Sequence, residues 1–129
     1  MKAEWWQQLG SWVETIEPVS GRRVVAACND AINRADLDTL ERLMTDDHRF
    51  VDRAGSVVEG RAACVDAWAG FFAVFPDYRN AFETVRPSSD GAIEVAGYSE
   101  CSDDRLREPA RWNVRVRDGL VEEWLVQDG

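Results

Sequence analysis

The first third of the chain has the apolar spacing of α-helices. One stripe recurs every three or four positions: Trp5, Leu9, Trp12, Val13 and Ile16. It predicts an amphipathic helix, and Pro18, with Ser20 and Gly21 after it, predicts the end of that helix. A second helical stripe follows: Val24, Val25, Cys28, Ala31, Ile32 and Ala35. Asp36 then predicts the N-cap of a short third helix, which has four apolar residues: Leu37, Leu40, Leu43 and Met44.

The middle of the chain predicts a hairpin and then a long helix. Residues 48–53 alternate, which is typical of a strand with its even-numbered side chains on one face and Arg49 and Arg53 toward solvent. The Ala-Gly-Ser sequence that follows predicts a turn into a short second strand at 57–58. Residues 61–75 return to helical spacing, and the proline after them predicts the end of this helix.

The second half of the chain predicts an antiparallel meander. Four segments have the composition of strands and are separated by turn signals such as Asp118-Gly119: 81–86, 92–101, 110–117 and 120–127. The polar stretch 102–108 fits a hairpin loop between two long strands. Helices first and strands afterwards, with one helix between the hairpin and the meander, predict an α+β fold.

Composition restricts the protein class. A length of 129 residues is typical of one domain, and no apolar run approaches the roughly 20 residues that span a membrane. The net charge of −9 disfavours nucleic acid and anionic membranes as partners. Glu4 stands where a signal peptide would begin its apolar core, and three widely spaced cysteines fit reduced thiols. We therefore expect a cytoplasmic protein with neither a nucleic-acid nor a membrane partner.

The scarcity of certain residues disfavours several kinds of chemistry. His48 is the only histidine, and no CxxC, HExxH or paired Cys/His cluster occurs, so we expect no metal site. Lys2 is the only lysine, which leaves no plausible Schiff-base nucleophile and no P-loop lysine. Neither GxSxG nor GxGxxG is present. The chemistry that remains uses carboxylates and aromatic rings, and no cofactor is expected.

Three segments resemble a known superfamily. Residues 24–48, with Phe-Val-Asp at 50–52, resemble the helix pair and first strand that open nuclear-transport-factor-2-like proteins. Residues 75–79, Phe-Pro-Asp-Tyr-Arg, are similar to the "FPDLR" of SnoaL-like polyketide cyclases. Residues 116–124 are similar to their final hairpin, "R-x-D-G-K-I-V-E-x-W", although one residue shorter. The resemblance covers about residues 21–128, and it is specific for fold rather than for activity.

The resemblance implies a cystatin-like, cone-shaped curved antiparallel sheet wrapped around the helices, with a ligand cavity on its concave face. It also implies a homodimer, because homodimers are common in the superfamily. Residues 21–129 would form a single SnoaL-like domain, and residues 1–20 an extra N-terminal amphipathic helix. That helix either packs on the domain or uses Trp5, Trp6 and Trp12 as a lid or interface.

Asp52 is the first candidate for a catalytic residue. Strand alternation places it on the apolar face with Phe50, where an unpaired carboxylate is costly. An apolar cavity would make it a stronger base toward a C–H proton next to a carbonyl. The resemblance adds that Asp52 aligns with the general-base aspartate of ketosteroid-isomerase-like members. The structural alternative is a side chain that bonds the backbone of the following turn.

Two positions depart from the isomerase pattern. The tyrosine and the acid that stabilise the enolate in that enzyme align with Cys28 and Trp112 of this chain. A thiol is a weak donor and an indole donates a single hydrogen bond, so neither is equivalent. Steroid isomerisation is therefore not the predicted reaction.

The other candidate site residues surround the same predicted pocket. His48 shares a face with Asp52 roughly 13 Å along the strand, so the two would flank one ligand rather than form a dyad. The predicted ligand-binding residues are Phe50, Trp68, Tyr98, Trp112 and Trp124. Gly97 suggests a bulge or bend in its strand, and the Tyr98 hydroxyl would replace the missing donor. For His48 and the aromatic residues the alternative is a purely structural role in the core.

The arginines 111, 115 and 117 form a row on one predicted strand face, and we expect them to pair with acids across the sheet such as Glu94 or Glu100. The alternative for this row is a dimer contact.

Two functions compete at this level. In the first, the domain binds a small apolar carbonyl or polycyclic compound and acts, if it is an enzyme, as a cofactor-free isomerase, cyclase or lyase with Asp52 as base. In the second, the pocket is filled by its own side chains, and the domain serves non-catalytic binding or dimerisation. A cavity of several hundred Å³ beside Asp52 would favour the first.

Overall fold

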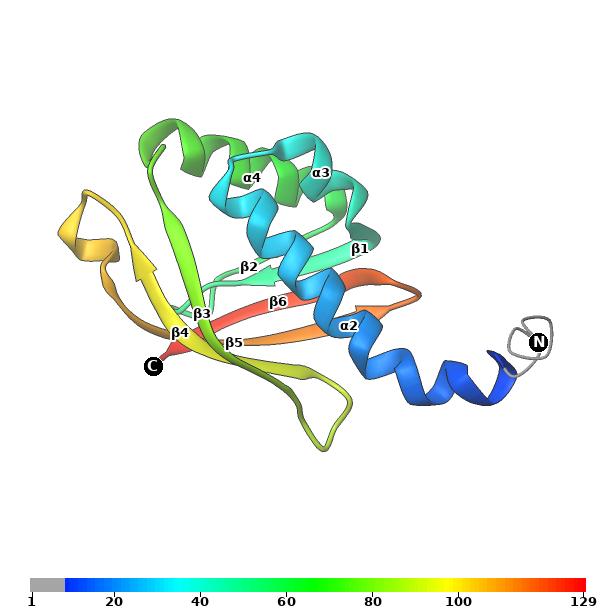
Figure 1. The fold of residues 1–129 in the computed structure, drawn as a ribbon. Coiled ribbons are helices and arrows are strands. Elements are labelled where there is room, and N and C mark those ends of the chain that lie inside the picture. Colours follow the sequence, from blue (N-terminus) through cyan, green and yellow to red (C-terminus); the bar gives the residue numbers. More distant parts are fainter. Residues whose placement is uncertain (1–8) are drawn as a thin grey trace.

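The computed structural model describes the backbone of residues 9–129 and the side chains of residues 21–129. Three α-helices lie on one side of a curved sheet (Figure 1): α2 at Leu9–Asn33, α3 at Leu37–Arg42 and α4 at Arg61–Val74. The predicted break after Pro18 is wrong, because α2 runs through it. A proline removes one backbone hydrogen bond, which a long helix can lose without ending. The predicted contacts of Trp5, Trp6 and Trp12 lie outside the described side chains.

Asp36 caps α3 as predicted. Its Oδ1 accepts from the backbone N–H of Thr39 at 3.1 Å, and its Oδ2 accepts from the Thr39 hydroxyl at 2.7 Å. Leu40, the buried residue of this short helix, packs into the core with α2 residues such as Ile32. The cap therefore ties α3 to the α2 turn and closes the helical layer at one end.

One sheet contains the six strands of residues 9–129, in the spatial order β2-β1-β6-β5-β4-β3. The strands are β1 at Met44–Val51, β2 at Val57–Glu59, β3 at Arg79–Pro87, β4 at Ile93–Glu100, β5 at Glu108–Arg117 and β6 at Leu120–Asp128. The predicted hairpin and meander are both confirmed. The predicted loop at 102–108 contains a single 3₁₀ turn, η1 at Asp104–Leu106.

The sheet differs from the predicted antiparallel one in a single respect. Strands β1 and β6 pair in parallel. The chain reaches β6 from β1 through α4 and the meander, and such a long crossover connection allows parallel neighbours. This pairing places Phe50 beside Trp124. The sheet consequently continues from the hairpin to the meander and carries residues from both ends of the domain on its concave face.

A bulge bends the sheet where β3 meets β4. The register shifts between Phe82 and Thr84, opposite Gly97. A Cβ atom built on Gly97 would collide with the backbone carbonyl of Ala81. The prediction placed the irregularity in the strand of Gly97, whereas the extra residue belongs to β3. The absent side chain of Gly97 allows the two strands to approach closely.

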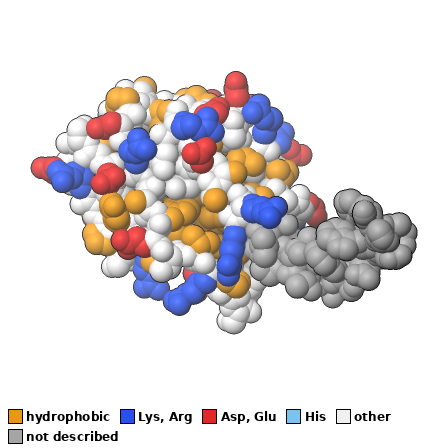
Figure 2. Space-filling model, viewed as in Figure 1, with side chains coloured by type: hydrophobic (Ala, Val, Ile, Leu, Met, Phe, Trp, Pro, Cys, Tyr) orange, Lys and Arg blue, Asp and Glu red, His pale blue; other side chains and the backbone are white. Residues whose placement is uncertain are grey.

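The core lies between α2, α4 and the concave face of the sheet. Its largest enclosed side chains include Trp112, Trp124, Ile32, Leu40 and Met44. Figure 2 shows one face of the molecule, on which acidic and basic side chains are interspersed and hydrophobic side chains gather toward the middle. Of the helices within residues 9–129, none combines the length and the apolar run that a membrane span requires.

The arginine row on the outer face pairs with other acids than those predicted. Arg115 contacts Asp90 at 3.0 Å, and Arg117 contacts Asp47 at 2.8 Å. Glu94 instead lies 3.9 Å from Arg86 on β3. The predicted partners, Glu94 and Glu100, both lie on β4. The acids that pair with the row are instead Asp90, on the turn between β3 and β4, and Asp47, on β1.

Candidate functional site

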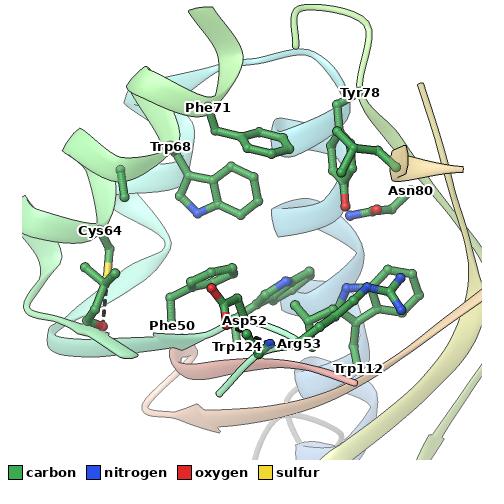
Figure 3. Close-up of a pocket in the computed structure, with 15 residues that line it drawn as sticks. Phe50, Asp52, Arg53, Cys64, Trp68, Phe71, Tyr78, Asn80, Trp112 and Trp124 are labelled. Atoms are coloured by element: carbon green, nitrogen blue, oxygen red, sulfur yellow. Dashed lines mark hydrogen bonds between the residues drawn. The ribbon is translucent and has the colours of Figure 1, made fainter. Parts of the chain in front are cut away.

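A cavity of about 500 Å³ lies between α4 and the concave face of the sheet. Figure 3 shows α4 side chains on one wall and residues of β1, β5 and β6 facing them. Most of the residues that line it are apolar, and the full set is Phe50, Asp52, Arg53, Ala54, Val58, Cys64, Ala67, Trp68, Phe71, Tyr78, Asn80, Leu106, Trp112, Trp124 and Val126. This volume is in the range of ordinary small-molecule sites.

Aromatic rings form much of the wall. Trp68 of α4 meets Phe50 edge to face at 5.6 Å between centroids, and it stacks on Phe72 at 5.3 Å. Across the cavity, Trp112 packs against Phe82 at 4.9 Å. These rings hold one another in offset and edge-to-face arrangements. Four of the predicted ligand-binding residues therefore line the cavity, and they do so without filling it: Phe50, Trp68, Trp112 and Trp124.

Asp52 lies one residue beyond the end of β1 and lines the cavity. Its Oδ1 accepts hydrogen bonds from the backbone N–H groups of Ala54 and Ser56, both at 2.9 Å. The alternative interpretation of Asp52 as a turn residue is thus correct, and it is compatible with a place in the cavity. Its other oxygen, Oδ2, accepts no hydrogen bond from the part of the chain that the structure describes. The turn holds the carboxylate in one orientation and leaves one oxygen available.

Arg53 also lines the cavity, although strand alternation predicted a solvent-facing side chain. The prediction was wrong because β1 ends at Val51, and the two-residue period does not continue into a turn. The guanidinium lies 3.1 Å from an Asp128 carboxylate oxygen and 3.7 Å from Glu108. The one cationic side chain that lines the cavity is therefore already paired with two carboxylates.

His48 is fully buried and is not among the residues that line the cavity. Its Nδ1 lies 2.8 Å from the carbonyl oxygen of Val121 on β6, and since a carbonyl only accepts, Nδ1 carries the proton. Burial lowers the pKa of His48, with the bond to Val121 opposing. The structure thus places a neutral imidazole between β1 and β6, and it does not bring His48 and Asp52 into one site.

Tyr98 does not reach the cavity either. Inward positions on β4 are odd-numbered, as the buried Val95 and Ser99 show, so Tyr98 points to the outer face and is 38% exposed. The hydroxyl that lines the cavity belongs instead to Tyr78, which precedes β3. Alternation along β3 would also have indicated the inward Asn80, had the strand been predicted to begin before residue 81.

Tyr78 and Asn80 belong to a polar cluster at one end of the cavity. The Tyr78 hydroxyl lies 3.1 Å from Ser99 Oγ, and Ser99 donates to Asn80 Oδ1 at 3.0 Å. Burial raises the pKa of Tyr78, so its phenol is neutral at physiological pH. Figure 3 shows Tyr78 and Asn80 side by side at one end of the cavity, away from Asp52.

The two cysteines near the site are buried thiols. Cys28, which aligns with the isomerase tyrosine, is buried outside the cavity lining, and burial raises the pKa of its thiol to about 12. Cys64 lines the cavity, but its Sγ donates to the carbonyl of Val58 at 3.4 Å and burial raises its pKa. Among the described residues, no three His, Cys, Asp or Glu side chains gather closely enough to hold a metal ion.

A mixed six-stranded sheet curved around helices, with an apolar cavity on its concave face, defines an α+β cone of the cystatin type. The SnoaL-like domain family matches residues 24–124, and the chain belongs to this family and to the nuclear-transport-factor-2-like superfamily. Among curated proteins, no sequence matches the chain.

Solved structures agree on the fold. A candidate polyketide cyclase from Sinorhizobium meliloti is 17% identical, with a TM-score of 0.73 over 81% of this chain and 94% of the other. A candidate SnoaL-like polyketide cyclase from Jannaschia sp. CCS1 is 20% identical, with a TM-score of 0.72 over 84% and 85%. A cystatin-fold protein from Novosphingobium aromaticivorans is 21% identical, with a TM-score of 0.68 over 81% and 94%.

Proposed function

We propose that this SnoaL-like domain binds an uncharged apolar carbonyl or polycyclic compound in the cavity and rearranges it as a cofactor-free isomerase, cyclase or lyase. The observation that carries the proposal is the cavity of about 500 Å³ with the anchored carboxylate of Asp52 on its wall. The solved structures described as candidate polyketide cyclases support the reaction class through their shared fold.

The lining supports an uncharged ligand. The walls are mainly aromatic and aliphatic, and the single cation among them, Arg53, is paired with Asp128 and Glu108. An anionic ligand would have to displace one of these carboxylates and lie beside Asp52. A flat ring system, in contrast, stacks on Trp68 or Trp112 at no electrostatic cost.

Asp52 supplies the base in this proposal. Its Oδ2 removes a proton from a carbon next to a ligand carbonyl, so that a C–H bond breaks and an O–H bond forms on the carboxylate. The resulting enolate either recovers the proton at another carbon, which is isomerisation, or attacks a second carbonyl carbon, whose oxygen then takes the proton back from Asp52, which is cyclisation. Because Ala54 and Ser56 hold Oδ1, the carboxylate stays oriented through both steps.

Binding is tested by thermal denaturation with a panel of apolar ring compounds, since a ligand that binds only the folded state stabilises it by mass action. We expect wild type and Asp52→Asn to gain several degrees with the same compounds, because the amide keeps the Oδ1 acceptor. Asp66→Asn, at an exposed position of α4, is the matched control. If no compound raises the melting temperature of any of these proteins, the proposal is overturned.

Catalysis is tested by hydrogen–deuterium exchange at the carbon next to the carbonyl of 1-tetralone, followed by NMR in D₂O. Wild type and Asp66→Asn should accelerate the exchange, and Asp52→Asn should lose at least about 100-fold of the acceleration. Equal exchange rates in the Asp52→Asn variant and wild type would remove Asp52 from the reaction.

A ligand-binding domain without turnover is the second candidate function. It is favoured by the position of Cys28, whose thiol is sealed outside the cavity where the isomerase has its enolate-stabilising tyrosine. Such stabilisation is usually the largest catalytic contribution. A tetralone that raises the melting temperature but shows no accelerated exchange would identify this second function.

A further inference from the structure

The proposed reaction needs a hydrogen-bond donor for the enolate oxygen, and the expected donors do not reach the ligand. Cys28 lies outside the cavity lining, and the Tyr98 hydroxyl points to the outer face of β4. At the polar end of the cavity, the side chains of Tyr78, Ser99 and Asn80 form hydrogen bonds with one another. A donor for the enolate therefore belongs to a different residue of the wall.

Arg53 has N–H groups that are not used by its ion pairs. A guanidinium carries five N–H donors, and Nη1 of Arg53 uses one of them toward Asp128 Oδ1 at 3.1 Å. The distance of 3.7 Å from Nε to Glu108 is too long for a hydrogen bond. The remaining four donors make no hydrogen bond to the part of the chain that the structure describes. The two carboxylates thus hold the guanidinium in place and leave most of its donors available to a neutral oxygen.

The positive charge of Arg53 faces the cavity. The residue belongs to the lining, and its side chain is 24% exposed, so a ligand in the cavity reaches it without any movement of the protein. Its charge also acts on the opposite end of the cavity. Burial raises the pKa of Tyr78, and the charge of Arg53 is among the influences that oppose this rise. A negative charge that forms on a ligand between these residues is therefore within the field of the guanidinium.

Asp52 and Arg53 are consecutive residues, and both side chains line the cavity because β1 ends at Val51. Figure 3 shows the two next to each other on the wall opposite Trp68 and Phe71. In a ketone, the carbon that loses its proton is bonded to the carbonyl carbon, so the base and the donor to the carbonyl oxygen have to be neighbours. The turn after β1 supplies both groups from adjacent positions.

We infer that the Arg53 guanidinium donates to the carbonyl oxygen of the ligand and stabilises the enolate that Asp52 generates. When Asp52 Oδ2 takes the proton, the electrons of the broken C–H bond move into the carbonyl group, and the carbonyl oxygen becomes negative. Arg53 transfers no proton. It stabilises the developing charge through its N–H groups and its own positive charge, which is the role of an oxyanion hole.

This inference rests on the proposed function, because it adds a second catalytic residue to the same site. It also explains how an arginine suits an uncharged ligand. An anion from solution would meet Asp52 and the two carboxylates already paired with Arg53. Proton transfer inside the site, in contrast, moves one negative charge from Asp52 to the ligand oxygen, so the total charge does not change. The site therefore favours an enolate formed in place over an anion that enters.

The first test measures kcat and KM for deuterium exchange of 1-tetralone. Arg53→Gln should lower kcat about 100-fold and change KM by about threefold or less, because an oxyanion donor acts mainly in the transition state. Arg53→Lys keeps the charge and should recover about 10-fold of this loss. Arg49→Gln, which removes an ion-paired arginine from the outer face of β1, is the matched control and should exchange like wild type. Circular dichroism checks that each variant is folded.

The second test needs no turnover and uses 4-nitrophenol, whose phenolate resembles an enolate oxygen and is recognised by its visible absorbance. The protein is Asp52→Asn, since the amide represents the neutral acid that accompanies the enolate. The bound phenol should ionise about 10-fold more readily than in water, because the charge of Arg53 favours the anion. In Asp52→Asn combined with Arg53→Gln this difference should disappear, whereas Asp52→Asn combined with Arg49→Gln should keep it.

The possible results separate the two proposals. If Arg53→Gln keeps the wild-type kcat, and the bound phenol ionises alike with and without Arg53, the inference is overturned and the proposed function stands. If wild type accelerates no exchange and binds neither compound, the proposed function fails and the inference fails with it. If the phenol binds and its ionisation depends on Arg53 while wild type accelerates no exchange, Arg53 is the contact of the ligand oxygen and the proposed reaction is overturned.

Discussion

Asn33 on α2 brackets the peptide group of Asn80 on β3, since its side chain accepts from the N–H at 2.8 Å and donates to the C=O at 3.0 Å. The two residues are 47 positions apart in the chain. Helix and strand are thus joined by a pair of hydrogen bonds that behaves like one rung of a sheet. This contact sets the position of β3 relative to the helical layer, and with it the polar end of the cavity.

Asn33→Ala should lower the free energy of unfolding by about 2 kcal/mol, because it leaves the partly buried backbone N–H of Asn80 without a partner, while the carbonyl keeps its bond from Asn29 Nδ2. Urea denaturation followed by circular dichroism measures the loss. Asn113→Ala, on the outer face of β5, removes an asparagine with no such contact and should change stability by less than about 0.5 kcal/mol. A loss of equal size in both variants would contradict the role of the Asn33 contact.

The two roles of Asp52 can be separated by substitution. Asp52→Ala removes the acceptor of two backbone N–H groups and should cost about 1 kcal/mol of folding stability. Asp52→Asn keeps an oxygen acceptor at the same place and should cost less than half as much. Urea denaturation of both variants is the measurement. A stable Asp52→Asn protein without exchange activity would identify a catalytic role, whereas equal destabilisation in the two variants would show that the turn needs the negative charge.

Folding stability should depend on the Asp47–Arg117 pair in acid. Hydrogen bonds from Arg117 lower the pKa of Asp47 from 3.8 to about 2. Between pH 4 and pH 2 the unfolded chain therefore binds a proton that the folded protein does not, so the contribution of the pair is complete above about pH 4 and is lost as pH falls toward 2.

Urea midpoints of wild type and Arg117→Gln, measured from pH 7 to pH 2.5, test this dependence. The difference between the two proteins should be constant above about pH 5 and should shrink below pH 4. Arg111→Gln, on the same strand face, is the control, because Arg111 has no ion pair with the described residues. A difference that persists unchanged at pH 2.5 would show that Arg117 acts through packing rather than through charge.

Two glycine substitutions should have opposite effects. Gly97→Ala places a Cβ against the carbonyl of Ala81 and should cost about 2 kcal/mol or more, since backbone cannot move aside easily. Gly70→Ala lies in α4, where a Cβ meets nothing within 4 Å, and should stabilise by about 0.5–1 kcal/mol. Thermal denaturation of both variants gives the signs. A tolerated Gly97→Ala would mean that β3 and β4 can separate at the bulge.

Local patterns accounted for most of the secondary structure. Apolar spacing predicted α4, and the residue type of Asp36 predicted the cap of α3. Alternation with turn signals predicted the hairpin and the meander. These patterns depend on neighbours within a few positions, so the chain order alone reveals them. The helix end predicted at Pro18 was wrong, because a long helix can continue past a single lost hydrogen bond.

The site was predicted in part. Phe50, Trp68, Trp112 and Trp124 were expected to face a common pocket and they line the cavity. Their inward direction follows from the periodicity of their own strand or helix. Tyr98 was placed in the pocket although β4 keeps its regular alternation, which turns this side chain to the outer face. The direction of Arg53 depended on where β1 ended, so both side chains were placed on the wrong side.

The amino-acid sequence by itself determined the α+β order, the family and the carboxylate-and-aromatic character of the site, because these depend on local periodicity and residue type. The tertiary structure alone decided the parallel β1–β6 pairing, the burial of His48 against Val121 and the meeting of Tyr78, Ser99 and Asn80 at one corner. Each of these contacts joins segments far apart in the chain. Local sequence patterns do not determine which residues of two distant segments lie opposite each other.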